Sequence, residues 1–411
     1  VVTYYPDSTE TRIKRSWCGI NSQCPTVGGN PGYYRVTSQT SGQSPSTQYY
    51  DRYGRVIRRD SLGFDGSFIN IDTEYDQFGR VERQSEPYFA GDTIYWNTQV
   101  FDVLGRTQER KFYDSEGAEQ TLLSNYNGFT TESIDALNHS TSVTVDALGR
   151  VITSTDAKTK SVSYVYDAAG NLLTTQVDGQ HTVTMTYDDL GRKRSLLDPD
   201  LGKWEYEYYK NGNIKEQISM RSLKDEDLPD ITTSFSYDRI GRMNLRTETN
   251  DLSGLDTSNW VYDSAVGKGK GSLASQKHIE SGKEHIKSYK YDNYGRHIDT
   301  FYSTDNNAFT SNMAQTYDEL GRLKSLIYPT GFKVNHSYNT NGYLTKVQRD
   351  DETKPLWEAH TLNARGQLEA AVLGNDVVDM KVYSPSNGAL SDSVVVSPEG
   401  TDSNLSRNVW L

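Results

Sequence analysis

A six-residue motif recurs along this chain in a nearly fixed register. Tyr50-Asp51-Arg52-Tyr53-Gly54-Arg55 returns as Tyr75-Asp76-Gln77-Phe78-Gly79-Arg80 and then many times more. Tyr stands four residues before the motif glycine in nine of twelve copies, Asp three before it in nine, and Arg directly after it in eight. This periodicity predicts an array of one supersecondary unit, with the copies stacked side by side. The twelve glycines are Gly54, Gly79, Gly105, Gly149, Gly170, Gly191, Gly212, Gly241, Gly295, Gly321, Gly342 and Gly366.

Six copies carry all four motif residues. In the middle of the chain, successive copies follow at intervals of 21 residues, from Gly128 to Gly212. Midway between them lies a second turn signal headed by Asp, as in Asp135-Ala136-Leu137-Asn138. Each unit is therefore predicted to contain two turns and two connecting runs. The complete copies are Tyr50, Asp51, Gly54 and Arg55; Tyr75, Asp76, Gly79 and Arg80; Tyr187, Asp188, Gly191 and Arg192; Tyr237, Asp238, Gly241 and Arg242; Tyr291, Asp292, Gly295 and Arg296; and Tyr317, Asp318, Gly321 and Arg322.

The runs between the turns alternate in polarity. Over residues 182–187, Val183, Met185 and Tyr187 share one face and oppose three Thr. Residues 161–166 and 203–208 alternate in the same way. A period of two, rich in Thr, Val and Tyr, predicts a strand with one packed and one polar face. Each 21-residue unit is thus predicted to be a β-hairpin.

The motif has the chemistry of a turn. An Asp at its head can accept hydrogen bonds from the backbone two residues on, which closes an Asx-type turn. The Gly three residues later supplies the positive φ of a type I turn followed by a G1 bulge. In the second turn series Asn138 takes the glycine's place, and Asn tolerates this conformation better than other side chains.

The motif Arg has two interpretations. In the first it makes a charge-assisted bond or a cation–π stack with the Asp and Tyr of a neighbouring repeat. In the second the arginines form a ladder that grips an acidic ligand. Because most copies also carry an Asp, the ladder is neutral on balance, and we favour the structural role.

Composition limits the class of protein. The chain has 411 residues, and its apolar share, with Gly counted and Tyr left out, is roughly 35%, against about 45–50% for an ordinary globular domain. A net charge of only −12 and 46 aromatic side chains argue against disorder. The mild acidity argues against a nucleic-acid partner. No apolar run approaches the ~18–20 residues that span a membrane. The sequence predicts a folded protein with a thin core.

A single hairpin cannot bury its apolar face, so the copies must stack. About fifteen units would give some thirty strands, more than an open twisted sheet carries without curling. The predicted fold class is all-β, with tandem hairpin repeats stacked into a long, curled, spiralling antiparallel sheet.

The register breaks in three places. Residues 1–48 lack the motif and are interpreted as an entry or cap segment, residues 49–390 as the repeat array, and residues 391–411 as a truncated C-terminal edge. The start at Val1, without Met, is interpreted as a fragment or a processed product. Cys18 and Cys24 form either a local disulfide or two free thiols, and too few ligands lie nearby for zinc. The acidic stretch 221–230 is most simply a solvated loop, with calcium as the alternative through Asp225, Glu226, Asp227 and Asp230.

Catalytic and cofactor signals are poor. The seven His are scattered, and neither a metalloprotease helix motif nor a nucleophile elbow is present. The plentiful carboxylates are mostly explained by turns. We therefore predict no catalytic residues, no cofactor and no metal. Aromatic rows that include Trp204 and Tyr206 could bind sugar rings, although in a sheet such rows are more often cross-strand packing.

The Tyr-Asp-x-x-Gly-Arg copies resemble the YD repeats of Rhs proteins, of the B and C shell components of Tc insecticidal toxins, and of teneurins. The resemblance covers roughly residues 49–390. It implies a hollow, spiralling β-sheet that encloses a toxic C-terminal polypeptide, with that cargo and other toxin-complex or secretion components as partners and a secreted or cell-surface location. An extracellular carbohydrate-binding or adhesion module, with glycans as partners, is the alternative.

The chain departs from the Rhs pattern in one informative respect. Rhs shells usually end in an Asp-Pro-x-Gly-Leu self-cleavage motif that precedes a variable toxin. The nearest string here is Asp198-Pro199-Asp200-Leu201-Gly202, which has one extra residue and lies in the second turn series. We interpret it as a turn and predict that the repeats have no enzymatic activity.

Overall fold

The computed structural model describes residues 1–7, 9–19, 24–220, 230–250, 254–280, 282–305 and 309–397. Within these ranges the chain forms strands and turns, and no α-helix. No helix in this part of the chain is therefore long and apolar enough to cross a membrane.

The strands are short, and most hold five to nine residues. In chain order they are β1 (Val2–Tyr4), β2 (Glu10–Trp17), β3 (Thr26–Val27), β4 (Asn30–Pro31), β5 (Tyr34–Thr40), β6 (Ser46–Tyr50), β7 (Val56–Leu62), β8 (Phe68–Tyr75), β9 (Val81–Ser85), β10 (Tyr88–Phe89), β11 (Trp96–Phe101), β12 (Thr107–Tyr113), β13 (Glu119–Asn127), β14 (Thr130–Ile134), β15 (Ser140–Val145), β16 (Val151–Thr155), β17 (Ser161–Tyr166), β18 (Leu172–Val177), β19 (His181–Tyr187), β20 (Lys193–Asp198), β21 (Gly202–Tyr208), β22 (Ile214–Met220), β23 (Ile231–Tyr237), β24 (Met243–Asn250), β25 (Gly254–Tyr262), β26 (Leu273–Glu280), β27 (Lys283–Tyr291), β28 (His297–Thr304), β29 (Phe309–Tyr317), β30 (Leu323–Ile327), β31 (Lys333–Tyr338), β32 (Leu344–Arg349), β33 (Pro355–Leu362), β34 (Leu368–Leu373), β35 (Val378–Tyr383) and β36 (Leu390–Val396).

Consecutive strands pair as antiparallel hairpins. Thirty-four of the strands described belong to one sheet, and β3 and β4 form a separate pair. A register shift interrupts the pairing where a strand ends at the motif Tyr, as between Thr186 and Tyr187 opposite β20. The predicted fold of tandem hairpins in one long antiparallel sheet is confirmed. The segment before residue 49 contributes β1, β2, β5 and the first part of β6 to the same sheet, although it lacks the motif.

The chain divides into two compact units. Unit 1 holds residues 1–123 and 315–411, and unit 2 holds residues 124–314. This division differs from the predicted boundaries at residues 48/49 and 390/391, which concern the extent of the repeat and stay predictions.

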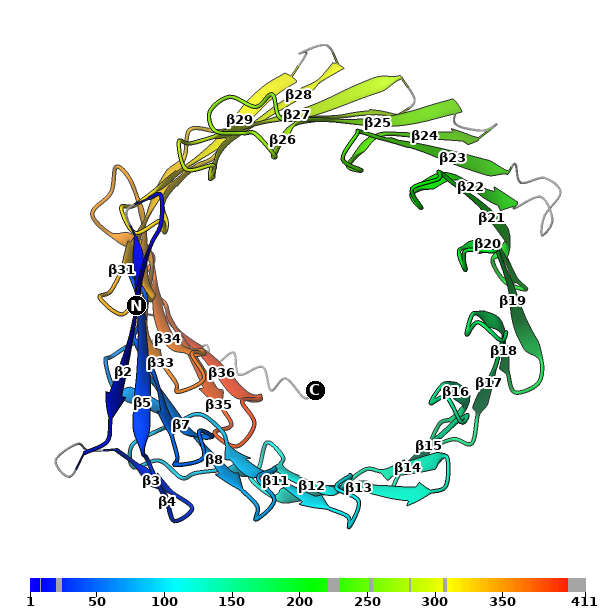
Figure 1. Cartoon of the computed structure of the whole chain (residues 1–411). Coiled ribbons are helices and arrows are strands. Elements are labelled where there is room, and N and C mark those ends of the chain that lie inside the picture. Colours follow the sequence, from blue (N-terminus) through cyan, green and yellow to red (C-terminus); the bar gives the residue numbers. More distant parts are fainter. Residues whose placement is uncertain are drawn as a thin grey trace. The chain divides into compact units, whose positions relative to one another are not determined.

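Unit 2 by itself is a curved strip of strands that follow one another in chain order (Figure 1, green to yellow). Because each connection reverses the chain, the turns alternate between the strip's two long edges. We call the edge with the motif turns, such as Asp146–Gly149 and Asp188–Gly191, the motif edge. The edge with the second turn series, such as Asp135–Asn138 and Asp156–Thr159, is called the opposite edge.

The two faces of unit 2 differ in chemistry, as the alternation predicts. Met185 lies opposite Leu196, and Leu196 lies opposite Trp204, so these side chains share one face across three strands. Thr186 lies opposite Ser195, and Ser195 lies opposite Glu205, on the other face. At these positions one face of the sheet is therefore apolar and the other polar, although Leu197 places an apolar side chain on the polar face.

Few side chains are fully buried. Across the residues described, ten hydrophobic side chains are less than a tenth exposed. In unit 1, Val27, Tyr49 and Ile57 form a cluster, against which Tyr75 and Trp96 pack. Ile57 and Asp51 are the largest side chains with almost no exposure. The core is thin, as the composition suggests, and its densest part surrounds the first motif turn.

Candidate functional site: the motif turns and the seam

The first motif turn shows how Asp, Gly and the backbone act together. The Asp51 carboxylate accepts hydrogen bonds of 2.9 Å from the backbone N–H groups of both Tyr53 and Arg55. The N–H of Gly54 donates to the carbonyl oxygen of Asp51, with φ of 78° at the glycine. The predicted Asx turn with a left-handed glycine is therefore confirmed at this position.

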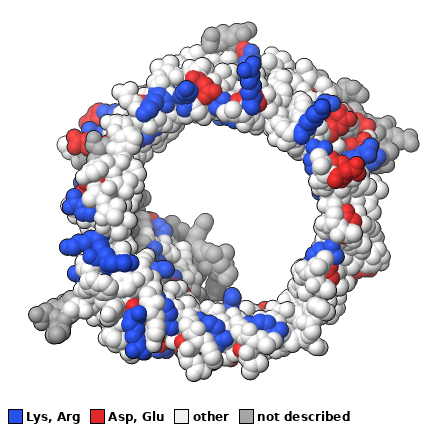
Figure 2. Space-filling model, viewed as in Figure 1, with Lys and Arg blue, Asp and Glu red and all other residues white. Residues whose placement is uncertain are grey.

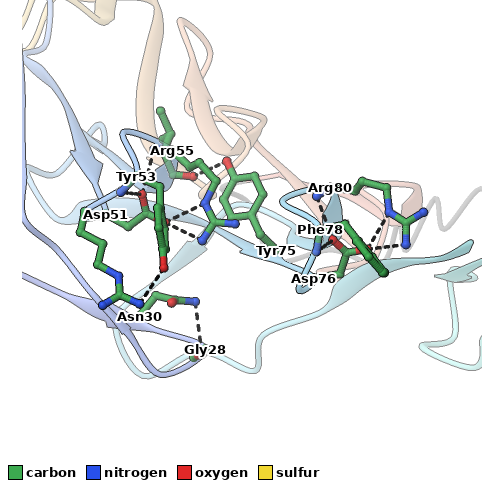
Figure 3. A network of polar contacts seen from close by, with 11 residues as sticks. Gly28, Asn30, Asp51, Tyr53, Arg55, Tyr75, Asp76, Phe78 and Arg80 are labelled. Carbon is green, nitrogen blue, oxygen red and sulfur yellow. Dashed lines mark hydrogen bonds and ion pairs between the residues drawn. The ribbon is translucent and has the colours of Figure 1, made fainter. Parts of the chain in front are cut away.

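The motif Arg binds a different carboxylate from the one expected. The Arg55 side chain donates 2.8 Å from Nε to Asp51 Oδ2, within its own repeat (Figure 3). Only the aromatic half of the expected contact reaches the next repeat, where the guanidinium lies 4.5 Å from the ring centre of Tyr75. At Arg55 the prediction of a neighbouring repeat's Asp is wrong, because the bulge brings the Arg back over the Asp four residues before it. Arg242 makes both contacts, since it also pairs with Asp263 of the next repeat.

The motif Tyr returns the contact. The Tyr75 hydroxyl donates a hydrogen bond of 2.8 Å to the carbonyl oxygen of Val56, two residues after the motif glycine of the preceding repeat. Two contacts thus join one repeat to the next. The Arg guanidinium of the first repeat packs on the Tyr ring of the second, and the hydroxyl of that Tyr donates to the backbone of the first. The sequence did not predict this hydroxyl bond. A Tyr at a strand end indicates that the ring packs, but it does not indicate which backbone carbonyl accepts the hydroxyl's hydrogen bond.

The same coupling recurs through both units. The guanidinium-to-ring pairs are Arg55–Tyr75, Arg80–Phe101, Arg150–Tyr166, Arg192–Tyr208, Arg242–Tyr262 and Arg322–Tyr338, at 4.3–5.0 Å. The hydroxyl bonds join Tyr75 to Val56, Tyr166 to Val151, Tyr187 to Leu172, Tyr208 to Lys193, Tyr262 to Met243, Tyr291 to Leu273 and Tyr338 to Leu323, at 2.8–2.9 Å.

The remaining complete copies have the same turn. The carboxylates of Asp76, Asp188, Asp238, Asp292 and Asp318 each bind the Arg four residues later, and each glycine between them has a positive φ. The side-chain and backbone hydrogen bonds from Arg192 hold the pKa of Asp188 below its ordinary value. Because these arginines are already paired with Asp residues, the contacts favour a structural role for the Arg ladder over binding of an acidic ligand.

The second turn series uses the same carboxylate geometry. Asp135 accepts from the backbone N–H groups of Leu137 and His139, and Asn138 takes the left-handed position with φ of 63°. Asp198 accepts from Asp200 and Leu201 at the β20–β21 turn, which confirms that the Asp198–Gly202 string is a turn.

In unit 1 the motif turns of residues 318–388 lie against turns of the second series in residues 40–117. Asn339 and Asn341 donate hydrogen bonds of 2.8 and 3.0 Å to the carbonyl oxygens of Phe64 and Gly63, although about 275 residues separate them along the chain. The Tyr343 hydroxyl binds the Leu62 carbonyl at 3.0 Å. We call this line of contacts the seam (Figure 1, where orange and blue strands lie side by side).

The seam continues along both segments. Leu320 packs over Gly42, where an added Cβ would lie 2.9 Å from the Leu320 Cβ. Arg365 forms an ion pair of 2.7 Å with Glu86. The Ser386 hydroxyl donates to the carbonyl oxygen of Asp114. Four successive turns of residues 318–388 therefore lie against four turns or strand ends of residues 40–117.

The remaining predictions concern the two cysteines and the acidic stretch 221–230. Cys18 and Cys24 form a disulfide with their Cα atoms 5.9 Å apart. Of the residues named for calcium, Asp225, Glu226 and Asp227 lie outside the described residues. The described ranges contain no group of three or more His, Cys, Asp or Glu residues that could hold a metal ion.

Several hollows lie along the strands of the residues described. One of about 540 Å³ lies in unit 2 and is lined mainly by Ser, aromatic and aliphatic side chains such as Tyr289 and Phe301. Trp204 borders a hollow of about 360 Å³, but its neighbour Tyr206 borders a different one. On the face in view, Lys and Arg are scattered among uncharged and acidic residues (Figure 2). Carbohydrate binding stays a prediction.

Comparisons with known proteins agree with this geometry. A family model described as RHS Repeat matches residues 145–183. The crystal structure of TcdB2-TccC3 has the same fold, with 15% identity and a TM-score of 0.73 over 95% of this chain and 23% of that chain. The crystal structure of TcdB2-TccC3 without its hypervariable C-terminal region matches with 15% identity and a TM-score of 0.72, over 93% of this chain and 22% of that one.

A structure of the Photorhabdus luminescens Tc holotoxin pore matches with 16% identity and a TM-score of 0.70, over 91% of this chain and 22% of that chain. The chain spans less than a quarter of the length of these structures. Comparison with curated protein sequences finds no match. The recurring motif and the family-model match over residues 145–183 show that the chain contains RHS-type YD repeats, and the solved structures show that it shares their fold.

Proposed function

We propose that the chain is a section of a β-sheet wall that encloses a polypeptide, as a structural component of a Rhs- or Tc-type toxin. The observation that carries this proposal is the fold itself. One sheet accounts for nearly all strands described, very few side chains are fully buried, and the same fold occurs in TcdB2-TccC3. A sheet with two accessible faces suits a wall better than it suits a solid globule.

The repeat coupling supports the same role. Eight motif turns carry their own paired Asp and Arg, so these copies add no net charge to the array. The bonds from Arg150 and Tyr187 to the adjoining repeats resist separation of neighbouring hairpins. We assign no catalytic step to the repeats. The partners are the enclosed polypeptide and other toxin-complex or secretion components, and the location is secreted or at the cell surface.

Protease protection tests enclosure in the polypeptide of natural length. An enclosed segment should survive protease while the wall is intact and be digested after the wall is opened by denaturant. The seam supplies a specific way to open it, because Arg365→Glu places two carboxylates together at Glu86. Combined with Asn339→Ala, which removes the bond to Phe64, this change should expose the protected segment.

Arg239→Glu is the matched control, since Arg239 is an exposed arginine in a motif turn outside the seam. Circular dichroism checks that both variants keep their strand content. Equal digestion of every segment outside the repeats in the intact wild-type protein would contradict the proposal.

A further inference from the structure

A hollow of about 400 Å³ lies along the seam in unit 1, and both sides of the seam contribute its walls. On one side the lining residues fall between residues 86 and 95, and on the other between residues 363 and 385. The ion pair of 2.7 Å between Arg365 and Glu86 joins the two sides at the hollow itself. The hollow is therefore a feature of the seam and not of a single strand or turn.

The charged groups of this hollow do not balance. Arg365 is the one basic residue among the described residues that line it, and it is already paired with Glu86. Asp92 from one side of the seam and Glu369 from the other also line the hollow, and neither has an ion-pair partner among the residues described. Burial and the charge of Asp92 raise the pKa of Glu369. Two like charges thus repel each other across a seam whose other contacts are attractive.

Aromatic residues form much of the remaining wall. The ring of Tyr88 is fixed, because this residue is only 8% exposed and its hydroxyl donates a hydrogen bond of 2.7 Å to Asp72. Tyr95 meets Tyr113 edge-on, with the ring centres 5.1 Å apart. Aromatic rings and carboxylates both attract cations, and the attraction to rings grows as the cation loses water. The aromatic residues that line the hollow are Tyr88, Phe89, Tyr95 and Tyr383.

We propose that the hollow binds an organic cation, an ammonium or guanidinium group, between Asp92 and Glu369. A Lys or Arg side chain of the polypeptide of natural length and a free amine both carry this chemistry. A bare metal ion fits less well, because a hard cation such as calcium takes six to eight oxygen ligands and the described ranges contain no group of three or more metal-binding side chains. The bound cation removes the repulsion between the two carboxylates and so strengthens the seam.

Titration calorimetry and thermal unfolding of the intact chain test the proposal, with N-acetyl-arginine amide and putrescine as the probes. Both probes should bind at neutral pH and raise the midpoint of unfolding, because a ligand of the folded state stabilises it. Glu369→Gln should weaken binding by about tenfold or more, since one of the two carboxylates loses its charge. Glu82→Gln is the matched control. It removes the same charge from an exposed residue of β9 outside the hollow and should leave binding unchanged.

The same titration on the polypeptide of natural length separates the two sources of the cation. If one of its own Lys or Arg side chains fills the hollow, the probes bind the 411-residue chain and not the longer polypeptide. If the natural ligand is a free amine, the probes bind both. Circular dichroism verifies that the Gln variants keep their strand content. Failure of both probes to bind the wild-type chain, an equal loss with Glu82→Gln, or tighter binding of calcium than of either probe would overturn the proposal.

Discussion

The hydroxyl of Tyr187 donates a hydrogen bond of 2.8 Å to the carbonyl oxygen of Leu172, 15 residues earlier in the chain. Leu172 stands two residues after the motif glycine Gly170, so the bond joins one motif turn to the strand that ends at the next. Burial raises the pKa of the Tyr187 hydroxyl, in keeping with a phenol that stays protonated and donates. The recurring Tyr is thus a donor as well as a ring.

Tyr187→Phe should lower the free energy of unfolding by about 1 kcal/mol, because the ring remains while one hydrogen bond is lost. Faster hydrogen exchange near Leu172 would locate the effect. Tyr294→Phe is the control, since no protein partner is described for the Tyr294 hydroxyl, and it should change stability little. Equal stability of the Tyr187→Phe variant and the wild type would show that the bond contributes nothing.

Arg192→Lys should destabilise the chain by about 1–2 kcal/mol even though the charge is kept. Arg192 donates from two nitrogens to Asp188 and from a third to the Tyr209 carbonyl, and it lies 4.8 Å from the ring centre of Tyr208. An ammonium group lacks this planar fork. Denaturant unfolding measures the change. Full rescue by Lys would show that charge alone matters at this position.

Gly149→Ala should cost about 1 kcal/mol of stability through backbone conformation alone. Gly149 has φ of 78°, and an added Cβ would meet nothing within 4 Å. Left-handed φ costs an L-residue roughly 1–2 kcal/mol, partly offset by the loss of freedom in the unfolded chain. Gly149→Asn should cost less, since Asn138 holds the equivalent position at φ of 63°. An Asn variant as unstable as the Ala variant would contradict this explanation.

Stability should fall in acid. Hydrogen bonds from Arg192 hold the pKa of Asp188 below its ordinary value, and those from Arg242 and Gly271 hold the pKa of Asp263 at about 2. A carboxyl whose pKa is lower in the folded state stabilises fully above its unfolded pKa of about 3.9. That contribution disappears as the pH falls through the folded value.

Thermal unfolding followed by circular dichroism between about pH 6 and pH 2 measures this loss. The midpoint should drop most steeply below about pH 4. Asp188→Asn should flatten the drop, and the Asn339 copy shows that Asn can head the same turn. A pH profile of the Asn variant that parallels the wild type would remove Asp188 from the explanation.

Local structure could be predicted from the sequence because each hairpin is specified within about 21 residues. The alternation of Val183, Met185 and Tyr187 against Thr places one face, and the Asp–Gly spacing places the bulge. The partner of the motif Arg was ambiguous, because nine of the twelve copies offer an identical Asp and the motif does not indicate which copy lies nearer.

The seam could not be predicted, because it joins residues about 275 positions apart and leaves no periodic trace. Its signal lies in departures from the motif. Asn339 replaces Asp and can donate to Phe64, which a carboxylate cannot, and Tyr343 replaces Arg and reaches Leu62. Only the folded structure shows that these departures from the motif make contacts across the seam and are not random variation among the repeats.

Enclosure of a polypeptide requires that one face of the sheet line an internal space. Val165 in β17 and Val177 in β18 form a matched pair on opposite faces, 52% and 42% exposed. In the polypeptide of natural length, Val165→Cys and Val177→Cys should both react with a small maleimide. A maleimide attached to a large polymer should label only one of them, and denaturation should restore labelling of the other. Equal labelling of both sites by the large reagent in the native protein would contradict enclosure.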